Sequence, residues 1–108
     1  LEYRTPGSDV NPYLSMAAAI GSGLLGIEKG LDPGEASTGN AYAKDVPIDH
    51  QLPTNLESAG ILFAQSEAAK DLFGEAFVKH FADSRIFEAR QFGRAVTDWE
   101  LKRYFEIL

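Results

Sequence analysis

An uncharged stretch of the chain, residues 12–27, most constrains what the chain can fold into. Asn11 and Pro12 precede it as a helix start signal, because Asn is a favoured N-cap and Pro fits the first helical position. We expect a helix over residues 13–29, ended by Gly30. Its larger apolar side chains surround the axis and are Leu14, Met16, Ile20, Leu24, Leu25 and Ile27. A helix that is apolar all round is buried in a large protein or in a membrane.

Two features favour a large protein assembly over a membrane. The uncharged stretch of 16 residues is shorter than the roughly 20 residues that span a bilayer, and no positively charged flank anchors it. The formal net charge of −6 at pH 7 also disfavours electrostatic binding to nucleic acid or to an anionic membrane. We therefore expect a cytoplasmic protein in which this helix is buried, with no nucleic-acid partner and no membrane association.

The residue types exclude several kinds of site. The chain has 108 residues and no cysteine, which excludes disulfides, thiolate zinc sites, iron–sulfur clusters and a cysteine nucleophile. Its two histidines, His50 and His80, stand apart and lack partners at ligand or triad spacing, so we expect both to be structural or solvated.

The beginning of the chain reads as the end of a strand. Leu1-Glu2-Tyr3-Arg4 alternates apolar and charged side chains, which is typical of a strand, and no initiator methionine precedes it. One strand cannot make a sheet, and no second alternating run follows. We therefore expect the chain to have been cut from something larger.

The rest of the sequence predicts a mainly α architecture of four or five helices in a single segment, residues 1–108. Residues 1–10 would form the strand end and a turn, and residues 11–30 the buried helix. Three prolines and two glycines in residues 31–53 predict a long loop, of a kind that is usually functional or wraps a neighbour. Residues 54–108 would form a helical bundle.

Capping signals divide the predicted bundle. The expected helices cover residues 56–65 after a capping box of Thr54 and Glu57, residues 67–73 between Ser66 and Gly74, residues 75–93, and residues 98–105 after a capping box of Thr97 and Glu100. In a capping box, the Ser or Thr side chain and the Glu three residues later satisfy each other's backbone amides. On the first of these helices Leu56, Ala59, Ile61, Leu62 and Phe63 would face the core. The spacing of Phe73, Phe77 and Phe81 predicts a buried helix face.

A glycine-rich motif in the uncharged helix matches the dinucleotide-binding fingerprint in its residue pattern but not in its structural context. The fingerprint G-x-G-x-x-G, here residues 21–26, functions between a strand and a helix that opens at it. Here the helix has already begun about ten residues earlier. We expect these glycines to let a neighbouring backbone approach a buried helix.

Glu2 and Arg4 form the most suggestive pair of polar residues. Side chains two positions apart on a strand point to the same face. A carboxylate there can ligate Mg²⁺ or Mn²⁺, and a guanidinium can hold a carboxylate or phosphoryl group with its planar fork. Taken by themselves, such pairs are more often weak surface ion pairs.

The residues that follow this pair decide the interpretation. The run Glu2-Tyr3-Arg4-Thr5-Pro6-Gly7-Ser8-Asp9-Val10-Asn11-Pro12-Tyr13-Leu14 resembles the glutamine synthetase family. The resemblance continues through Gly39-Asn40-Ala41-Tyr42, Leu52-Pro53-Thr54-Asn55-Leu56-Glu57 and Val96-Thr97-Asp98-Trp99-Glu100. It covers essentially the whole chain, but only the C-terminal quarter or so of that family's catalytic region. These sequence motifs are most similar to those of glutamine-synthetase-like γ-glutamyl-amine (γ-glutamylpolyamine) ligases.

The resemblance implies the α+β glutamine synthetase catalytic fold and a role for each residue of the pair. Glu2 would ligate a divalent metal, and Arg4 would contact the glutamate substrate and the transferring phosphoryl group. The reaction would use ATP and Mg²⁺ or Mn²⁺ to activate glutamate as γ-glutamyl phosphate, which ammonia or an amine then attacks. Tyr42 lies where some bacterial members carry an adenylylated tyrosine, but its surroundings differ, so we expect a structural role.

The resemblance also implies what the chain lacks. The other metal ligands and the nucleotide-binding residues lie upstream in the family, so the 108-residue chain alone should be inactive. The parent enzyme would be a homo-oligomer, of a ring type. The alternative is a non-catalytic helical packing or assembly module derived from such an enzyme.

Overall fold

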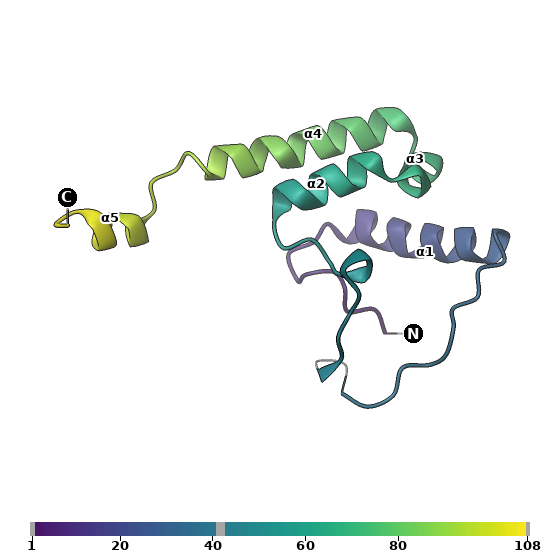
Figure 1. The fold of residues 1–108 in the computed structure, drawn as a ribbon. Helices are drawn as coiled ribbons and strands as arrows, with labels where there is room; N and C mark the ends of the chain where they lie inside the picture. The colour runs from purple at the N-terminus through teal and green to yellow at the C-terminus, as the bar shows by residue number, and fades with distance from the viewer. Residues whose placement is uncertain (1, 41–42, 108) are drawn as a thin grey trace. The chain divides into compact units, whose positions relative to one another are not determined.

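The structure, a computed structural model, describes residues 2–40 and 43–107 and is helical throughout its regular parts (Figure 1). Its helices are α1 (Pro12–Glu28), the short 3₁₀ helix η2 (Ile48–His50), α2 (Leu56–Gln65), α3 (Glu67–Phe73), α4 (Glu75–Phe92) and α5 (Asp98–Tyr104). The expected mainly α architecture is confirmed. Tyr42, which we expected to be structural, lies outside the described residues.

The strand end expected at residues 1–4 is not formed among the described residues, where residues 2–4 carry no strand assignment. A strand is defined by backbone hydrogen bonds to a neighbouring strand, and the described part of the chain contains no such neighbour. The chain divides into two compact units, one ending at Asp49 and one beginning at His50.

The first unit contains α1, whose two ends are capped as the sequence predicts. The Asn11 side chain accepts hydrogen bonds from the amides of Tyr13 and Leu14, at 3.0 and 3.3 Å. At the other end Gly30 takes the left-handed conformation with φ of +60°. The amides of Gly30 and Leu31 donate to carbonyls of the last turn at 3.1 and 2.9 Å, which is the Schellman arrangement.

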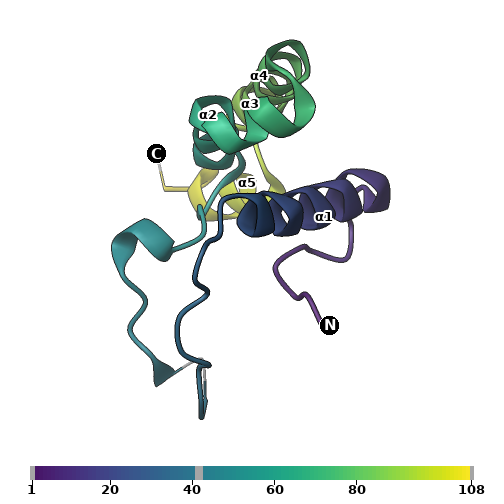
Figure 2. The ribbon, with the colours of Figure 1, turned by 90° about the vertical axis from the view of Figure 1, so that its right-hand side faces the viewer.

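In the second unit α2 and α4 lie side by side (Figure 1 and Figure 2). Gly60 allows their close approach, because a Cβ there would stand 3.0 Å from Cγ1 of Ile86. An ion pair of 3.6 Å between Glu57 and Arg90 also connects the two helices. Among the described residues, the buried apolar side chains are Ala69, Val78 and Ala82.

Four phenylalanines complete the packing of α2, α3 and α4. Phe63 of α2 meets Phe73 and Phe81 at ring-centroid distances of 6.3 and 5.7 Å, and Phe77 stacks on Phe81 at 5.6 Å. The aromatic face expected from the spacing is therefore formed, although its rings are half-buried rather than fully buried. It spans a helix break, because Gly74, with φ of +82°, separates α3 from α4.

Two local predictions for α2 are wrong. The helix begins at Leu56, so Asn55 is its N-cap, and the Asn55 side chain accepts from the amide of Ser58 at 2.8 Å. Asn is at least as good an N-cap as Thr, which explains why Thr54 does not take that position. Leu56, Ile61 and Leu62, expected in the core, are exposed by 45%, 45% and 57%, because α2 buries only the face that meets α4.

The capping box predicted at the start of the last helix is formed. The Thr97 hydroxyl accepts from the amide of Glu100 at 3.2 Å, and a carboxylate oxygen of Glu100 accepts from the amide of Thr97 at 2.7 Å. Both hydrogen bonds of the capping box are present at the start of α5.

Candidate functional site

Glu2 and Arg4 lie on the same side of the chain, as the spacing predicts. The Nε of Arg4 donates a hydrogen bond to a carboxylate oxygen of Glu2, and the two side chains form an ion pair. Both are exposed, with 71% of the Glu2 side chain and 82% of the Arg4 side chain accessible. The following turn and the N-cap Asn11 connect this pair directly to α1.

This arrangement leaves the pair able to bind an anion and a cation together. An arginine side chain has five N–H donors in a planar fork, and Glu2 engages the Nε donor. The fork matches the two oxygens of a carboxylate or phosphoryl group. A carboxylate has about four lone-pair directions, so Glu2 can accept from Arg4 and ligate a metal ion with its remaining capacity.

A divalent metal fits this site only in part. Mg²⁺ is usually held by one or two carboxylates, together with water and substrate phosphates, and Glu2 supplies one such carboxylate. Within residues 2–40 and 43–107, no group of three or more His, Cys, Asp or Glu side chains could hold a metal ion. A cluster of three or more protein ligands would therefore have to include residues outside the described ones.

The glycine motif and the two histidines are the other features singled out in the sequence. The glycine motif of residues 21–26 lies inside α1, so it does not form the strand-to-helix turn of a dinucleotide site. His50 and His80 are both exposed. In the described part of the chain, no helix is long and apolar enough to cross a membrane.

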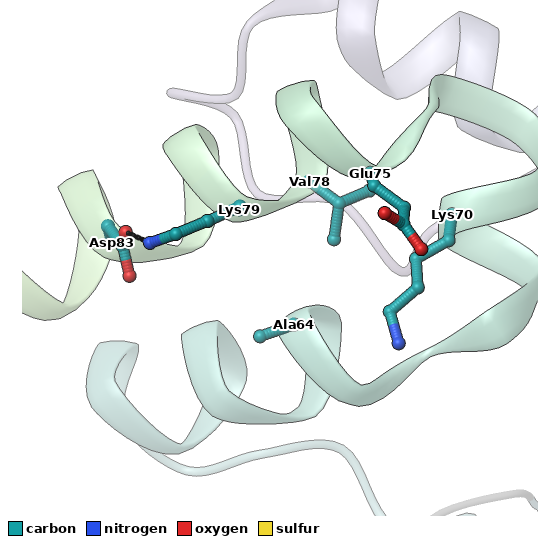
Figure 3. A pocket seen from close by; sticks show the side chains of 6 residues that line it. All are labelled: Ala64, Lys70, Glu75, Val78, Lys79 and Asp83. Atoms are coloured by element: carbon teal, nitrogen blue, oxygen red, sulfur yellow. Dashed lines mark hydrogen bonds and ion pairs between the residues drawn. The ribbon is translucent and has the colours of Figure 1, made fainter.

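A shallow hollow of about 290 Å³ lies between the helices of the second unit (Figure 3). Its lining residues are Ala64, Lys70, Glu75, Val78, Lys79 and Asp83. Lys70 pairs with Glu67 at 2.6 Å and Lys79 with Asp83 at 2.6 Å. The hydrogen bond from Lys70 to Glu67 raises the pKa of the Lys70 ammonium above its ordinary value of 10.5. Both cations of the hollow are therefore already engaged by neighbouring carboxylates.

Comparison with known proteins identifies the family. Residues 1–104 match the family model of the glutamine synthetase catalytic domain. The chain belongs to the glutamine synthetase family. The resemblance seen in the sequence is thereby confirmed, and Glu2 and Arg4 lie within the matched region. No solved structure matches the chain.

The relatives of this family member are named as a ligase or as synthetases. A glutamate–isopropylamine ligase of a Pseudomonas species is 42% identical over 108 residues, which are 100% of this chain and 24% of the relative. A γ-glutamylethanolamide synthetase of Streptomyces coelicolor is 45% identical over 105 residues, 97% of this chain and 22% of the relative. Type-1 glutamine synthetase 2 of Dictyostelium discoideum is 41% identical over 109 residues, 99% of this chain and 21% of the relative. The chain thus spans about a quarter of the length of these relatives.

Proposed function

We propose that the chain is the C-terminal catalytic segment of an ATP-dependent ligase that joins the γ-carboxylate of glutamate to ammonia or to an amine. The observation that carries this proposal is the Glu2–Arg4 pair, with its carboxylate and guanidinium in contact. The pair stands at the start of a chain that matches a ligase family over almost its whole length.

Arg4 would act on the anions of the reaction. ATP would transfer its γ-phosphoryl group to the glutamate γ-carboxylate, giving γ-glutamyl phosphate and ADP. The amine nitrogen then forms a bond to the carbonyl carbon of the γ-carboxyl group, inorganic phosphate leaves from that carbon, and the nitrogen loses a proton. The Arg4 fork would hold the glutamate and the phosphoryl oxygens in place, because a positioned guanidinium stabilises charge that develops on transferring phosphoryl oxygens.

Glu2 would have two tasks. Its hydrogen bond with Arg4 Nε orients the edge of the guanidinium, and its remaining lone pairs would ligate the divalent metal. Mg²⁺ or Mn²⁺, when bound, would supply positive charge to the phosphate oxygens of ATP. The parent enzyme is proposed to be a cytoplasmic homo-oligomer, and the 108-residue chain alone is proposed to be inactive, since most of the site lies outside it.

An organic amine is a suitable candidate acceptor alongside ammonia. Two of the three relatives described above carry an amine product or substrate in their names, isopropylamine and γ-glutamylethanolamide. The third is named a glutamine synthetase. We therefore propose testing small monoamines, polyamines and ammonia together. A non-catalytic packing module is the second candidate, and the exposed apolar side chains of α1 favour it.

The test uses the full-length protein that contains these 108 residues. Formation of ADP and of the γ-glutamyl product is measured with ammonia, isopropylamine, ethanolamine and polyamines, with the 108-residue chain as the inactive control. Product formation that needs ATP, glutamate and one acceptor supports the ligase. A folded full-length protein that forms no product with any acceptor would favour the packing module, and turnover by the 108-residue chain alone would contradict the proposed inactivity.

A further inference from the structure

Asn11 alone satisfies the backbone amides of the first turn of α1. Pro12 has no amide hydrogen. The Asn11 side chain accepts from the amides of Tyr13 and Leu14 at 3.0 and 3.3 Å, and its backbone carbonyl accepts from the amide of Ser15 at 3.0 Å. Free amides at a helix N-terminus can bind an anion. Because Asn11 engages these amides, the start of α1 has a different task from binding a phosphoryl or carboxylate group.

That task is indicated by the short connection between Asn11 and Arg4, which consists of residues 5–10. Pro6 fixes its own backbone φ at about −65°. The amide of Val10 donates to the carbonyl of Gly7 at 3.4 Å, which closes a turn immediately before the cap. The connection therefore has few free backbone rotations, and a displacement at the start of α1 is passed on to the Arg4 backbone.

Glu2 fixes the guanidinium of Arg4 but not the Arg4 backbone. The Arg4 Nε donates to a carboxylate oxygen of Glu2, and both side chains are exposed, so burial does not hold the pair in place. Residues 2–4 form no regular structure. The nearest regular element in the chain is α1, and its start is defined by Asn11. The cap and the turn before it are therefore the part of the described chain that determines where the Arg4 backbone lies.

We infer that Asn11 is a positioning residue for Arg4. Its cap holds the first turn of α1, and the turn of residues 7–10 passes that position on to the arginine. The inference rests on the proposed function, in which Arg4 contacts glutamate and the transferring phosphoryl group. A displaced guanidinium loses the alignment of its fork with two oxygens, and a misplacement of about 1 Å can lower a rate by about 10²-fold. Asn11 acts through Arg4 and is not itself a catalytic residue.

The test uses the full-length protein that contains these 108 residues. Asn11→Ala removes the cap, and Asn11→Ser restores it, because Ser caps a helix about as well as Asn. The matched control is Asn55→Ala. Asn55 caps α2 in the other unit by the same kind of hydrogen bond, from the amide of Ser58 at 2.8 Å, so its removal should cost a similar amount of stability.

Three quantities are measured for each variant: the kcat and KM for glutamate, the thermal unfolding midpoint, and the amide hydrogen exchange of residues 5–10 by mass spectrometry. For Asn11→Ala we expect kcat/KM for glutamate to fall by roughly 10- to 100-fold and the exchange to rise. Asn11→Ser should recover most of both losses. Asn55→Ala should lower the midpoint by a similar amount and leave both kcat/KM and the exchange of residues 5–10 unchanged.

A double substitution separates positioning from general loss of stability. If Asn11 acts through Arg4, then Asn11→Ala should have little further effect on kcat/KM in an Arg4→Lys background, because the fork that it positions is already absent. Coupled residues show such non-additive effects, whereas independent ones add. Additive effects of the two substitutions would overturn the inference.

Two other results would also overturn it. The first is a loss of kcat/KM in Asn11→Ala no larger than in Asn55→Ala. The second is unchanged exchange of residues 5–10 in Asn11→Ala, because the cap would then not hold the turn. A full-length protein that forms no product with any acceptor, but whose exchange rises in Asn11→Ala, would overturn the proposed function and support the hold of the cap on the Arg4 backbone.

Discussion

Gly60 of α2 lies against Ile86 of α4, so that a Cβ on Gly60 would stand 3.0 Å from Cγ1 of Ile86. The carbonyl oxygen of Ala82 would be 3.4 Å away and Cβ of Arg85 3.6 Å away. The space is therefore bounded by backbone as well as by one movable side chain. This contact sets how closely the two helices pack.

Gly60→Ala should destabilise the second unit. The gain in helix propensity, about 1 kcal/mol, is smaller than the upper range of the overpacking cost, about 1–3 kcal/mol, and we expect a net loss of about 1 kcal/mol. Urea unfolding followed by circular dichroism measures it. In an Ile86→Ala background the crowding carbon is absent, so Gly60→Ala should become stabilising. Equal effects in both backgrounds would show that the contact does not limit the packing.

Val78 should be the most sensitive apolar position of α4, since it is 1% exposed. Val78→Ala removes two methyl groups and leaves a cavity, which should cost about 2–3 kcal/mol in the free energy of unfolding. Val96→Ala is the matched control, because Val96 is 69% exposed and should change stability by less than about 0.5 kcal/mol. Similar losses for the two variants would contradict the placement of the core around Val78.

The start of α2 can be tested with two neighbouring residues. Asn55→Ala removes the side chain that accepts from the amide of Ser58 and should cost about 1 kcal/mol. Thr54→Ala should have an effect within about 0.5 kcal/mol, because Thr54 precedes the cap. Chemical denaturation of both variants measures the difference in the free energy of unfolding. A larger loss of stability for Thr54→Ala would contradict Asn55 as the cap and favour the capping box expected from the sequence.

The capping box of α5 should weaken in acid. Hydrogen bonds from the amide and hydroxyl of Thr97 lower the pKa of the Glu100 carboxyl below its ordinary value of 4.5. A group with a lowered folded-state pKa stabilises the fold fully above its unfolded pKa, and this contribution is lost as pH falls through the folded value. The amide signals of Thr97 and Glu100 in NMR should therefore titrate with a midpoint below 4.5. Glu100→Gln should abolish this titration, and a midpoint at or above 4.5 would contradict the hydrogen-bonded arrangement.

Much of the helical layout follows from the sequence because its signals are local. Asn11, Ser66 and Thr97 cap the helices expected of them, since a cap needs only amides two or three residues away. The prediction of Thr54 as the N-cap of α2 is wrong because the next residue, Asn55, is an equally good cap. The exposure of Ile61 and Leu62 could not be predicted, because an apolar residue indicates burial without identifying the surface that buries it.

For the candidate site, too, the sequence predicts only the contacts between residues that are close together in the chain. The two-residue period of an extended segment places Glu2 and Arg4 on one side, and the structure joins them in an ion pair. A metal centre depends on ligands that are distant in sequence, and the described residues contain no cluster of three or more potential ligands. The local pattern can therefore indicate one ligand of a site but not the complete set.

Under the proposed roles, substitutions of Glu2 and of Arg4 should change different kinetic parameters of the full-length protein. Glu2→Gln keeps the shape of the side chain but loses the charge, so it should raise the Mg²⁺ concentration needed for half-maximal rate by roughly tenfold or more. Arg4→Lys keeps the charge but loses the planar fork. It should raise the KM for glutamate and lower kcat by on the order of 10²-fold, with a smaller change in Mg²⁺ dependence. Steady-state rates over a grid of glutamate and Mg²⁺ concentrations separate the two effects. Identical patterns for the two variants would mean that the pair acts only as a structural ion pair.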